Sequence, residues 1–201
     1  LPYTENTPLK GEFPYEVSKS CCDLIAQMYA KTYGMPIAIT RFGNIYGPGD
    51  LNMNRVIPGA IFAALSGKPF EIRTDGTLIR EYTYVTDVVS AYLHIMSLIE
   101  QVKGEAFNVS SGQKMSVLEV VDRISAVMNV PIEKKILNIS KHEIKDQWLS
   151  HDKAANVLKW KATTSFEDGI KKTADWYQKS LLMKQHQQQS QKQQDVGGVF
   201  H

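Results

Sequence analysis

Apolar residues recur every three to four positions in the first third of the chain. Between residues 15 and 33 these positions are Val17, Cys21, Leu24, Ile25, Met28 and Tyr29. Such spacing predicts an amphipathic helix. Gly34 then stands at a position that favours glycine after a helix, and Pro36 follows it. We therefore expect the helix to end at Tyr33.

Short apolar runs rich in β-branched residues follow, and they indicate strands. They cover residues 36–42, 70–73, 78–85, 106–109 and 132–139. Asp75-Gly76 lies between the second and third runs and predicts a hairpin turn. Residues 43–54 contain three glycines, one proline and three asparagines, which favours a loop at the end of the first strand.

Helical spacing returns four more times, and the chain offers capping residues for these helices. The predicted helices cover residues 55–66, 87–101, 116–129 and 164–182. Thr86 or Asp87 is expected to cap the second of them. The third and fourth open with Ser116-x-x-Glu119 and Thr164-x-x-Glu167, both of which fit a capping box. The alternation of helix and strand predicts an α/β fold.

Composition narrows the function classes. The chain has 23 Lys and Arg against 21 Asp and Glu, a net charge of +2, which disfavours a nucleic-acid partner. No apolar run reaches the ~20 residues that span a bilayer, so no membrane partner is expected. The two cysteines, Cys21 and Cys22, are adjacent and build neither a disulfide framework nor a metal cluster, which favours the cytoplasm. Residues 184–201 begin with a glutamine-rich stretch and are expected to form a disordered tail.

Tyr15 and Lys19 are the first residues that suggest chemistry. A spacing of four places both side chains on one face of the predicted helix. A nearby ammonium favours the phenolate form of a tyrosine, which makes it a usable acceptor for an alcohol proton. The alternative is a surface pair in which the tyrosine ring packs on the lysine stem.

Two further features suggest a ligand site. Asn44 lies in the loop after the first strand, where open α/β sheets bind ligands, although asparagine also suits a tight turn there. Arg55, Arg73 and Arg80 lie on three predicted elements. Arginine is suited to grip phosphate oxygens, so the three could form a diphosphate site, or each could be a solvated surface residue.

Six segments taken in order carry a family resemblance. They are P-Y-E-V-S-K (14–19), R-F-G-N-I-Y-G-P-G-D (41–50), N-R-V-I-P (54–58), D-G-T-L-I-R-E-Y-T-Y-V-T-D (75–87), F-N-V-S-S-G (107–112) and T-S-F-E-D-G-I-K-K-T-A-D-W-Y (164–177). Together they resemble the extended short-chain dehydrogenase/reductase family of NAD-dependent sugar-nucleotide epimerases and dehydratases. Within it, S-K-S-C-C-D-L-I-A-Q looks most like the CDP-glucose 4,6-dehydratase branch.

The resemblance implies a cofactor and a reaction. Tyr15 would be the catalytic tyrosine, and Lys19 would hold the nicotinamide ribose of NAD and support the tyrosine. Phe42, Asn44 and Ile45 would lie beside the nicotinamide. The implied activity is dehydration or epimerisation through a 4-keto sugar.

The resemblance also implies a nucleotide-sugar substrate. The positions that would contact it are Asn44, Arg55, Val56, Glu71, Arg73, Arg80 and Asn108. Family members usually carry an arginine in the segment that matches residues 140–149, whereas this chain has Lys141 and Lys145 there. Its binding of the phosphates would therefore either be weaker or depend on Arg73 and Arg80 alone.

The implied organisation is the C-terminal part of a doubly wound Rossmann-type domain plus a small α/β substrate-binding domain. Residues 1–50 would belong to the cofactor domain and 51–183 mainly to the substrate domain. No G-x-x-G-x-x-G turn occurs in the sequence, so the glycine-rich half would precede residue 1 in an intact homodimeric enzyme. The alternative is a non-catalytic module that binds a nucleotide sugar or a partner protein.

Overall fold

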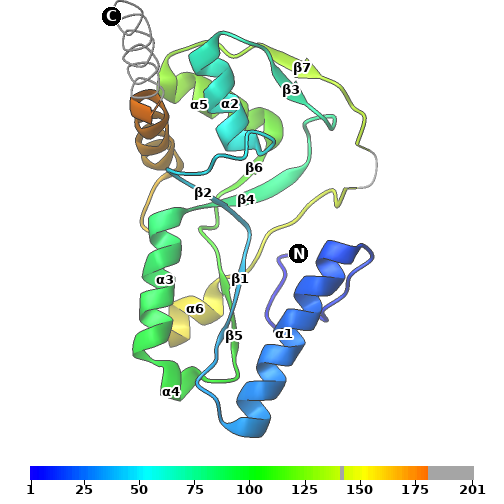
Figure 1. Ribbon diagram of the computed structural model, residues 1–201, viewed down its shortest axis with the longest axis vertical. Helices are drawn as coiled ribbons and strands as arrows, with labels where there is room; N and C mark the ends of the chain where they lie inside the picture. The colour runs from blue at the N-terminus through cyan, green and yellow to red at the C-terminus, as the bar shows by residue number, and fades with distance from the viewer. Residues whose placement is uncertain (141–142, 181–201) are drawn as a thin grey trace, which may run out of the picture.

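The computed structural model describes residues 1–140 and 143–180 and confirms the α/β class. A pair of parallel strands runs along the lower part of the molecule, between α1 and α3, and a second group of strands and helices lies above it (Figure 1). The elements are α1 (Pro14–Tyr33), β1 (Ile39–Phe42), β2 (Asn44–Tyr46), α2 (Val56–Ser66), β3 (Phe70–Ile72), β4 (Ile79–Tyr84), α3 (Val85–Ser97), α4 (Ile99–Val102), β5 (Ala106–Val109), β6 (Lys114–Ser116), α5 (Val117–Met128), β7 (Lys134–Ile136), α6 (Asp152–Val157) and a helix over 166–180.

The strands form three small groups. β1 pairs in parallel with β5, and β3 in parallel with β7. β4 lies between β2, to which it is parallel, and β6, to which it is antiparallel. Gly43 alone separates β1 from β2, so one nearly continuous stretch links the lower and upper parts. A Cβ at Gly43 would lie 3.3 Å from the Cβ and the carbonyl oxygen of Glu81, which explains the glycine.

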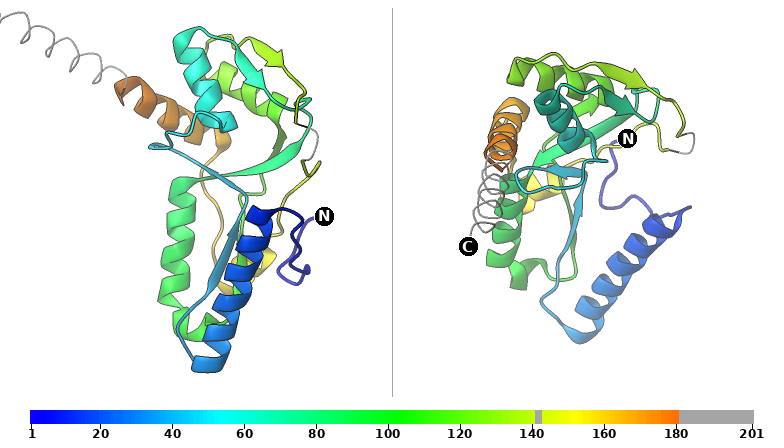
Figure 2. Two further views of the ribbon diagram at one scale, coloured as in Figure 1. Left: turned by 45° about the vertical axis from the view of Figure 1, so that its right-hand side comes forward. Right: turned by 45° about the horizontal axis from the view of Figure 1, so that its top comes forward.

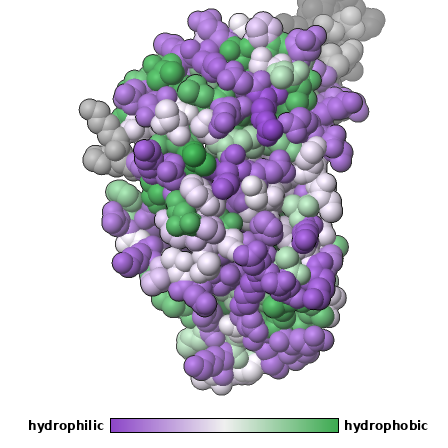
Figure 3. Space-filling model, turned by 180° about the vertical axis from the view of Figure 1, so that it is seen from behind, coloured by the Kyte–Doolittle hydropathy of each residue, from purple (hydrophilic) through white to green (hydrophobic). Residues whose placement is uncertain are grey.

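Each part has its own apolar core. The upper core joins α2, α5, β4 and the helix over 166–180, with Ile61, Ile124 and Phe166 fully buried. The lower core lies between α3, β5 and the segment around α6, with Phe107 and Trp160 at its centre. Seen from behind, the surface is mainly hydrophilic and its apolar residues are scattered (Figure 3).

Helix α1 stands apart from both cores. It runs beside β1 but projects away from the rest of the molecule (Figure 2). Of its 20 residues only Asp23 and Ala30 are buried, while the apolar face that predicted the helix is exposed. Nothing in the described part of the chain covers this face.

Several predicted elements are confirmed. Gly34 and Gly67 end α1 and α2 with positive φ angles of 66° and 65°. Ser116 and Glu119 form the predicted capping box of α5.

No helix in residues 1–140 and 143–180 is long and apolar enough to cross a membrane.

Other local predictions are wrong. The runs around Asp75-Gly76 form no hairpin, because β3 pairs with β7 while β4 pairs with β2 and β6. The predicted loop over 43–54 contains β2, and neither β6 nor α6 was predicted. β7 is shorter than the predicted strand over 132–139.

Two predicted helix caps also differ from the structure. Asp87 does not cap α3, whose first turn has no side-chain cap; its carboxylate instead accepts hydrogen bonds from Thr163 and Thr164. The last helix is capped one residue later than expected, by Ser165 paired with Asp168. The predicted tail lies outside the described residues.

Candidate active site

Tyr15 and Lys19 lie together at the start of α1. The Lys19 Nζ atom is 5.5 Å from the centroid of the Tyr15 ring, and the tyrosine side chain is 73% exposed. Pro14 at the first helical position fixes where the helix begins, and hence where Tyr15 points relative to the helix axis. The pair is therefore an ammonium held against a phenol that is open to a ligand.

The strand end at β1 and β2 presents a second group. The Phe42 ring packs against Tyr92 of α3 with centroids 5.5 Å apart. Asn44 and Ile45 follow on β2, opposite Tyr82 and Thr83 of β4, and both are exposed. The Asn44 side chain is thus exposed, and its amide can contact a ligand at this strand end.

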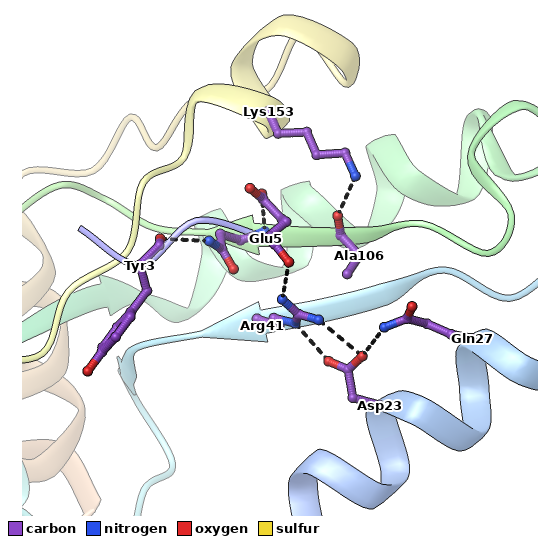
Figure 4. A network of polar contacts seen from close by, with 8 residues as sticks. Tyr3, Glu5, Asp23, Gln27, Arg41, Ala106 and Lys153 are labelled. Carbon is purple, nitrogen blue, oxygen red and sulfur yellow. Dashed lines mark hydrogen bonds and ion pairs between the residues drawn. The ribbon is translucent and has the colours of Figure 1, made fainter. Parts of the chain in front are cut away.

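A polar network joins α1 to β1 (Figure 4). Arg41 of β1 grips Asp23 of α1 with two nitrogens, at 2.7 Å and 3.2 Å, and Gln27 donates to the same carboxylate at 2.5 Å. Burial alone would raise the pKa of Asp23, but these hydrogen bonds and the arginine charge hold it below its ordinary value. Arg41 also donates to the Glu5 carbonyl at 3.0 Å. This network connects the helix that carries Tyr15 to the strand that leads to Asn44.

Asn108 of β5 belongs to the same network. Its backbone N–H donates to the Glu5 carboxylate at 2.8 Å, and its side-chain amide donates to the Tyr3 carbonyl at 3.0 Å. The residue is 1% exposed, and its Oδ1 atom has no partner among the described residues. Asn108 therefore faces the segment around residues 3–5 and not the solvent.

The remaining candidates lie in the upper part. Val56 begins α2, and Arg55 just before it is 62% exposed and paired with Asp50 at 2.9 Å. On β3, Glu71 pairs with Lys135 of β7 at 2.8 Å. Arg73 follows directly after β3 and is exposed. Arg55 and Arg73 are thus both exposed on the upper part, where each can contact an anionic ligand.

Arg80 is already engaged within the protein. Its guanidinium donates to the carbonyls of Ile144 and Lys145 at 2.6 Å and 3.1 Å and lies 3.6 Å from the Glu143 carboxylate. The arginine thus holds the segment in which family members usually carry their own arginine. Lys141 of that segment lies outside the described residues.

Glu81 is a structural carboxylate that the sequence did not single out. It is 1% exposed and accepts hydrogen bonds from Ser110, from the Gly112 N–H at 3.0 Å and from the Leu149 N–H at 3.1 Å. Burial raises its pKa despite these donors. The hydrogen bonds of Glu81 therefore connect β4 to the segment 110–112 and to Leu149, next to Gly43.

The candidate residues thus form three groups: α1, the β1–β2 end, and the α2–β3–β4 region. Sequence reasoning missed Asp23, Arg41 and Glu5, which connect the first two. Asp23 lies on the face of α1 opposite its exposed apolar stripe, so the hydrophobic spacing gave no signal for it. Arg41 stands inside a motif that was noted for its asparagine.

The model of the NAD dependent epimerase/dehydratase family matches residues 1–110. The chain belongs to this family. A dTDP-glucose 4,6-dehydratase of Neisseria gonorrhoeae is 31% identical over 188 residues, which cover 87% of this chain and 53% of that protein. A trifunctional UDP-glucose 4,6-dehydratase/epimerase/reductase of Arabidopsis thaliana is 33% identical over 165 residues, which cover 82% of this chain and 24% of that protein.

Solved structures agree with this placement. A dTDP-glucose 4,6-dehydratase from Bacillus anthracis in complex with NAD has a TM-score of 0.77 and 31% identity; the match covers 89% of this chain and 56% of that one. A UDP-glucose 4-epimerase from Thermotoga maritima with UDP-glucose has a TM-score of 0.82 and 27% identity, covering 90% of this chain and 58% of that one. The chain therefore spans about half the length of the Neisseria, Bacillus and Thermotoga proteins and about a quarter of the Arabidopsis protein.

Proposed function

We propose that this chain is the C-terminal part of an NAD-dependent sugar-nucleotide 4,6-dehydratase or epimerase, with the end of its cofactor domain and its substrate domain. The observation that carries the proposal is the Tyr15–Lys19 pair in a chain of the epimerase/dehydratase family. The Lys19 Nζ atom lies 5.5 Å from the centroid of the Tyr15 ring. The names of its relatives support a nucleotide sugar as the substrate. The CDP-glucose branch remains a prediction.

The residues present fit one end of NAD. Lys19 and Tyr15 are open at the start of α1, and Asn44 and Ile45 are exposed at the strand end, so these four with Phe42 would hold the nicotinamide and its ribose. The glycine-rich turn that holds a pyrophosphate does not occur in this sequence. NAD, when bound, accepts a hydride from the sugar.

Tyr15 would act as the base in this reaction. Its phenolate would take the proton of the sugar 4-hydroxyl, with the positive charge of Lys19 stabilising that phenolate. The resulting 4-keto sugar has an acidified neighbouring C–H bond, and elimination or epimerisation follows. Both outcomes return the hydride within one cycle.

The substrate contacts follow from the upper part of the molecule. Asn44 would reach the diphosphate, and Arg55 and Val56 would contact the nucleotide part of the substrate. Glu71 and Arg73 would lie beside the nucleotide base. Arg80 would contribute after leaving its carbonyl partners in the 143–145 segment, or by holding that segment against the substrate. Asn108 would act from within the protein, by fixing the strand beside the site.

The organisation of the intact protein is part of the proposal. Residues 1–50 would complete a cofactor domain, residues 51–183 would form most of a substrate domain, and the enzyme would be a cytoplasmic homodimer. The exposed apolar face of α1 supports a further covering element or subunit.

The test starts from the coding sequence upstream of Leu1. A strand, G-x-x-G-x-x-G turn and helix there support the enzyme, and the protein expressed with this segment should convert at least one nucleotide sugar to a 4-keto product that absorbs in the ultraviolet. A folded protein that converts no CDP-, UDP- or dTDP-sugar would contradict the proposal. An unrelated upstream domain would instead favour a non-catalytic binding module.

A further inference from the structure

A pocket of about 440 Å³ opens between α3 and the segment that follows α6. It is lined by Ser90, His94, Lys159, Trp160, Lys161 and Thr163, among others. None of the residues assigned above to the cofactor or the substrate lines it. α1 and α3 lie on opposite sides of the β1–β5 pair (Figure 1), so the pocket is also remote from the Tyr15–Lys19 pair. The pocket is shallow and open to solvent.

The side chains of this pocket favour negative charge. Lys159 and Lys161 flank Trp160 in sequence, and no carboxylate is among the lining residues. Within residues 1–140 and 143–180 neither lysine forms an ion pair. The His94 Nδ1 atom lies 2.8 Å from the Ser90 carbonyl, which can only accept, so Nδ1 carries a proton and Nε2 is left for another partner.

Trp160 adds an independent observation. The side chain is 1% exposed, and its indole N–H has no acceptor among the described residues. Buried N–H groups are nearly always hydrogen-bonded, so one without an acceptor calls for an explanation. Thr163, in contrast, already donates to Asp87 through both its N–H and its hydroxyl. The pocket therefore holds more donors than the protein satisfies.

The backbone at Lys159 turns the chain at the end of α6. Lys159 has a positive φ of 55° and follows the C-cap residue Leu158. The backbone N–H of Trp160 donates to the Ala154 carbonyl at 3.3 Å, as is usual where a left-handed residue ends a helix. This turn places Lys159 in the pocket wall beside Trp160.

We propose that this pocket binds a small anion with two or more negative charges, such as a phosphate monoester or a polycarboxylate. Lys159 and Lys161 supply the charge, His94 supplies a further polar contact, and an anionic oxygen accepts the orphaned indole N–H of Trp160. This site is separate from the proposed nucleotide-sugar site and does not depend on it.

The test follows the indole N–H signals of the ¹⁵N-labelled 201-residue chain by NMR. Trp148, Trp160 and Trp176 give three signals, and Trp148→Phe and Trp176→Phe assign the third without altering the pocket. Inorganic phosphate, glucose 6-phosphate and citrate are titrated separately, with sodium chloride at matched ionic strength. We expect at least one of the three to shift the Trp160 signal saturably, and chloride to leave it in place. The anion that saturates at the lowest concentration identifies the preferred chemistry.

Two double variants decide whether the pocket is responsible. Lys159→Gly, which suits the positive φ, combined with Lys161→Gln should weaken the response at least tenfold. Lys171→Gln with Lys179→Gln removes the same charge from the last helix and should leave it unchanged. Unmoved Trp148 and Trp176 signals show that each variant remains folded. The absence of a saturable Trp160 shift up to about 50 mM of every anion, or equal weakening in both variants, would overturn the proposal.

Discussion

Helices α5 and α1 are both amphipathic, but only α5 buries its apolar face. Val120, Val121 and Ile124 of α5 are fully buried in the upper core, against α2 and the last helix. On α1, by contrast, Leu24 and Met28 are 57% and 45% exposed. The same hydrophobic spacing thus predicts a helix in both cases, while the covering element is present only for α5.

The two helices are also attached in different ways. α5 is held by apolar packing and by its capping box, whereas α1 is held to β1 through the Asp23–Arg41 ion pair and the Glu5 segment. The apolar face of α5 is thus covered within the described part of the chain, and that of α1 is not. This difference leads to five predictions.

The largest effect should appear in ligand binding. The chain should bind NAD several powers of ten more weakly than an intact family enzyme, because each missing charge-assisted hydrogen bond costs ~1.5–3 kcal/mol. CDP or UDP should still bind measurably, since Arg55 and Arg73 lie in the upper part, which has its own buried core. Calorimetric titration with each ligand checks this. Micromolar affinity for NAD would show that the cofactor site does not depend on a segment outside this chain.

Truncating an apolar side chain should lower the free energy of unfolding more in α5 than in α1. Ile124→Ala should lower the free energy of unfolding by ~2–4 kcal/mol, because it leaves a cavity in the upper core. Leu24→Ala should change it by less than ~0.5 kcal/mol, because the side chain is exposed. Urea unfolding followed by circular dichroism measures both. Equal losses would mean that α1 is covered in solution, for example by a second copy of the chain.

The sequence alone predicts the local helices of this fold but not its long-range strand pairing and contacts. Repeated spacing and end signals located α1, α2 and α5 correctly, because these depend on local chemistry. The predicted hairpin at Asp75-Gly76 is wrong because β3 pairs with β7 and β4 with β2 and β6, all of them more than 30 residues away, and no local pattern encodes such pairing. The same holds for Asn108 and Arg80, whose motifs were recognised but whose partners around residues 3–5 and 144–145 could be seen only in the fold.

Removing the Asp23 carboxylate charge should loosen α1 selectively. Asp23→Asn should cost ~1–3 kcal/mol, because it leaves the buried part of Arg41 without its charged partner. Amide hydrogen exchange should rise over α1 and stay unchanged over α5. Asp175→Asn, at an exposed position of the last helix, is the matched control and should leave both helices as they are.

The pH dependence of this variant follows from the lowered pKa of Asp23. A carboxyl whose folded pKa is depressed stabilises the protein above its ordinary value of 3.8, and this contribution is lost as the pH falls through the folded value. The acid limb of the stability curve should therefore be shallower for Asp23→Asn below about pH 4. An identical acid limb would contradict a role for this ion pair.

The smallest effect should come from the capping box. Ser116→Ala removes the hydroxyl that accepts the Glu119 N–H and should cost ~1 kcal/mol in the free energy of unfolding. Ser18→Ala on α1, where the serine bonds only a carbonyl of its own helix, is the control and should stay within ~0.5 kcal/mol of the parent. Thermal unfolding resolves the two. Equal values would mean that the cap does not stabilise α5.

The role of Tyr15 is tested most directly by turnover of a nucleotide sugar by the intact protein that contains this chain. We expect Tyr15→Phe to lower kcat by about 10²–10⁴, the range for loss of a positioned acid–base group. Tyr33→Phe, at an exposed tyrosine at the far end of the same helix, should leave kcat unchanged. A Tyr15→Phe enzyme that forms the 4-keto product as fast as the parent would contradict the assignment of α1 to the catalytic site.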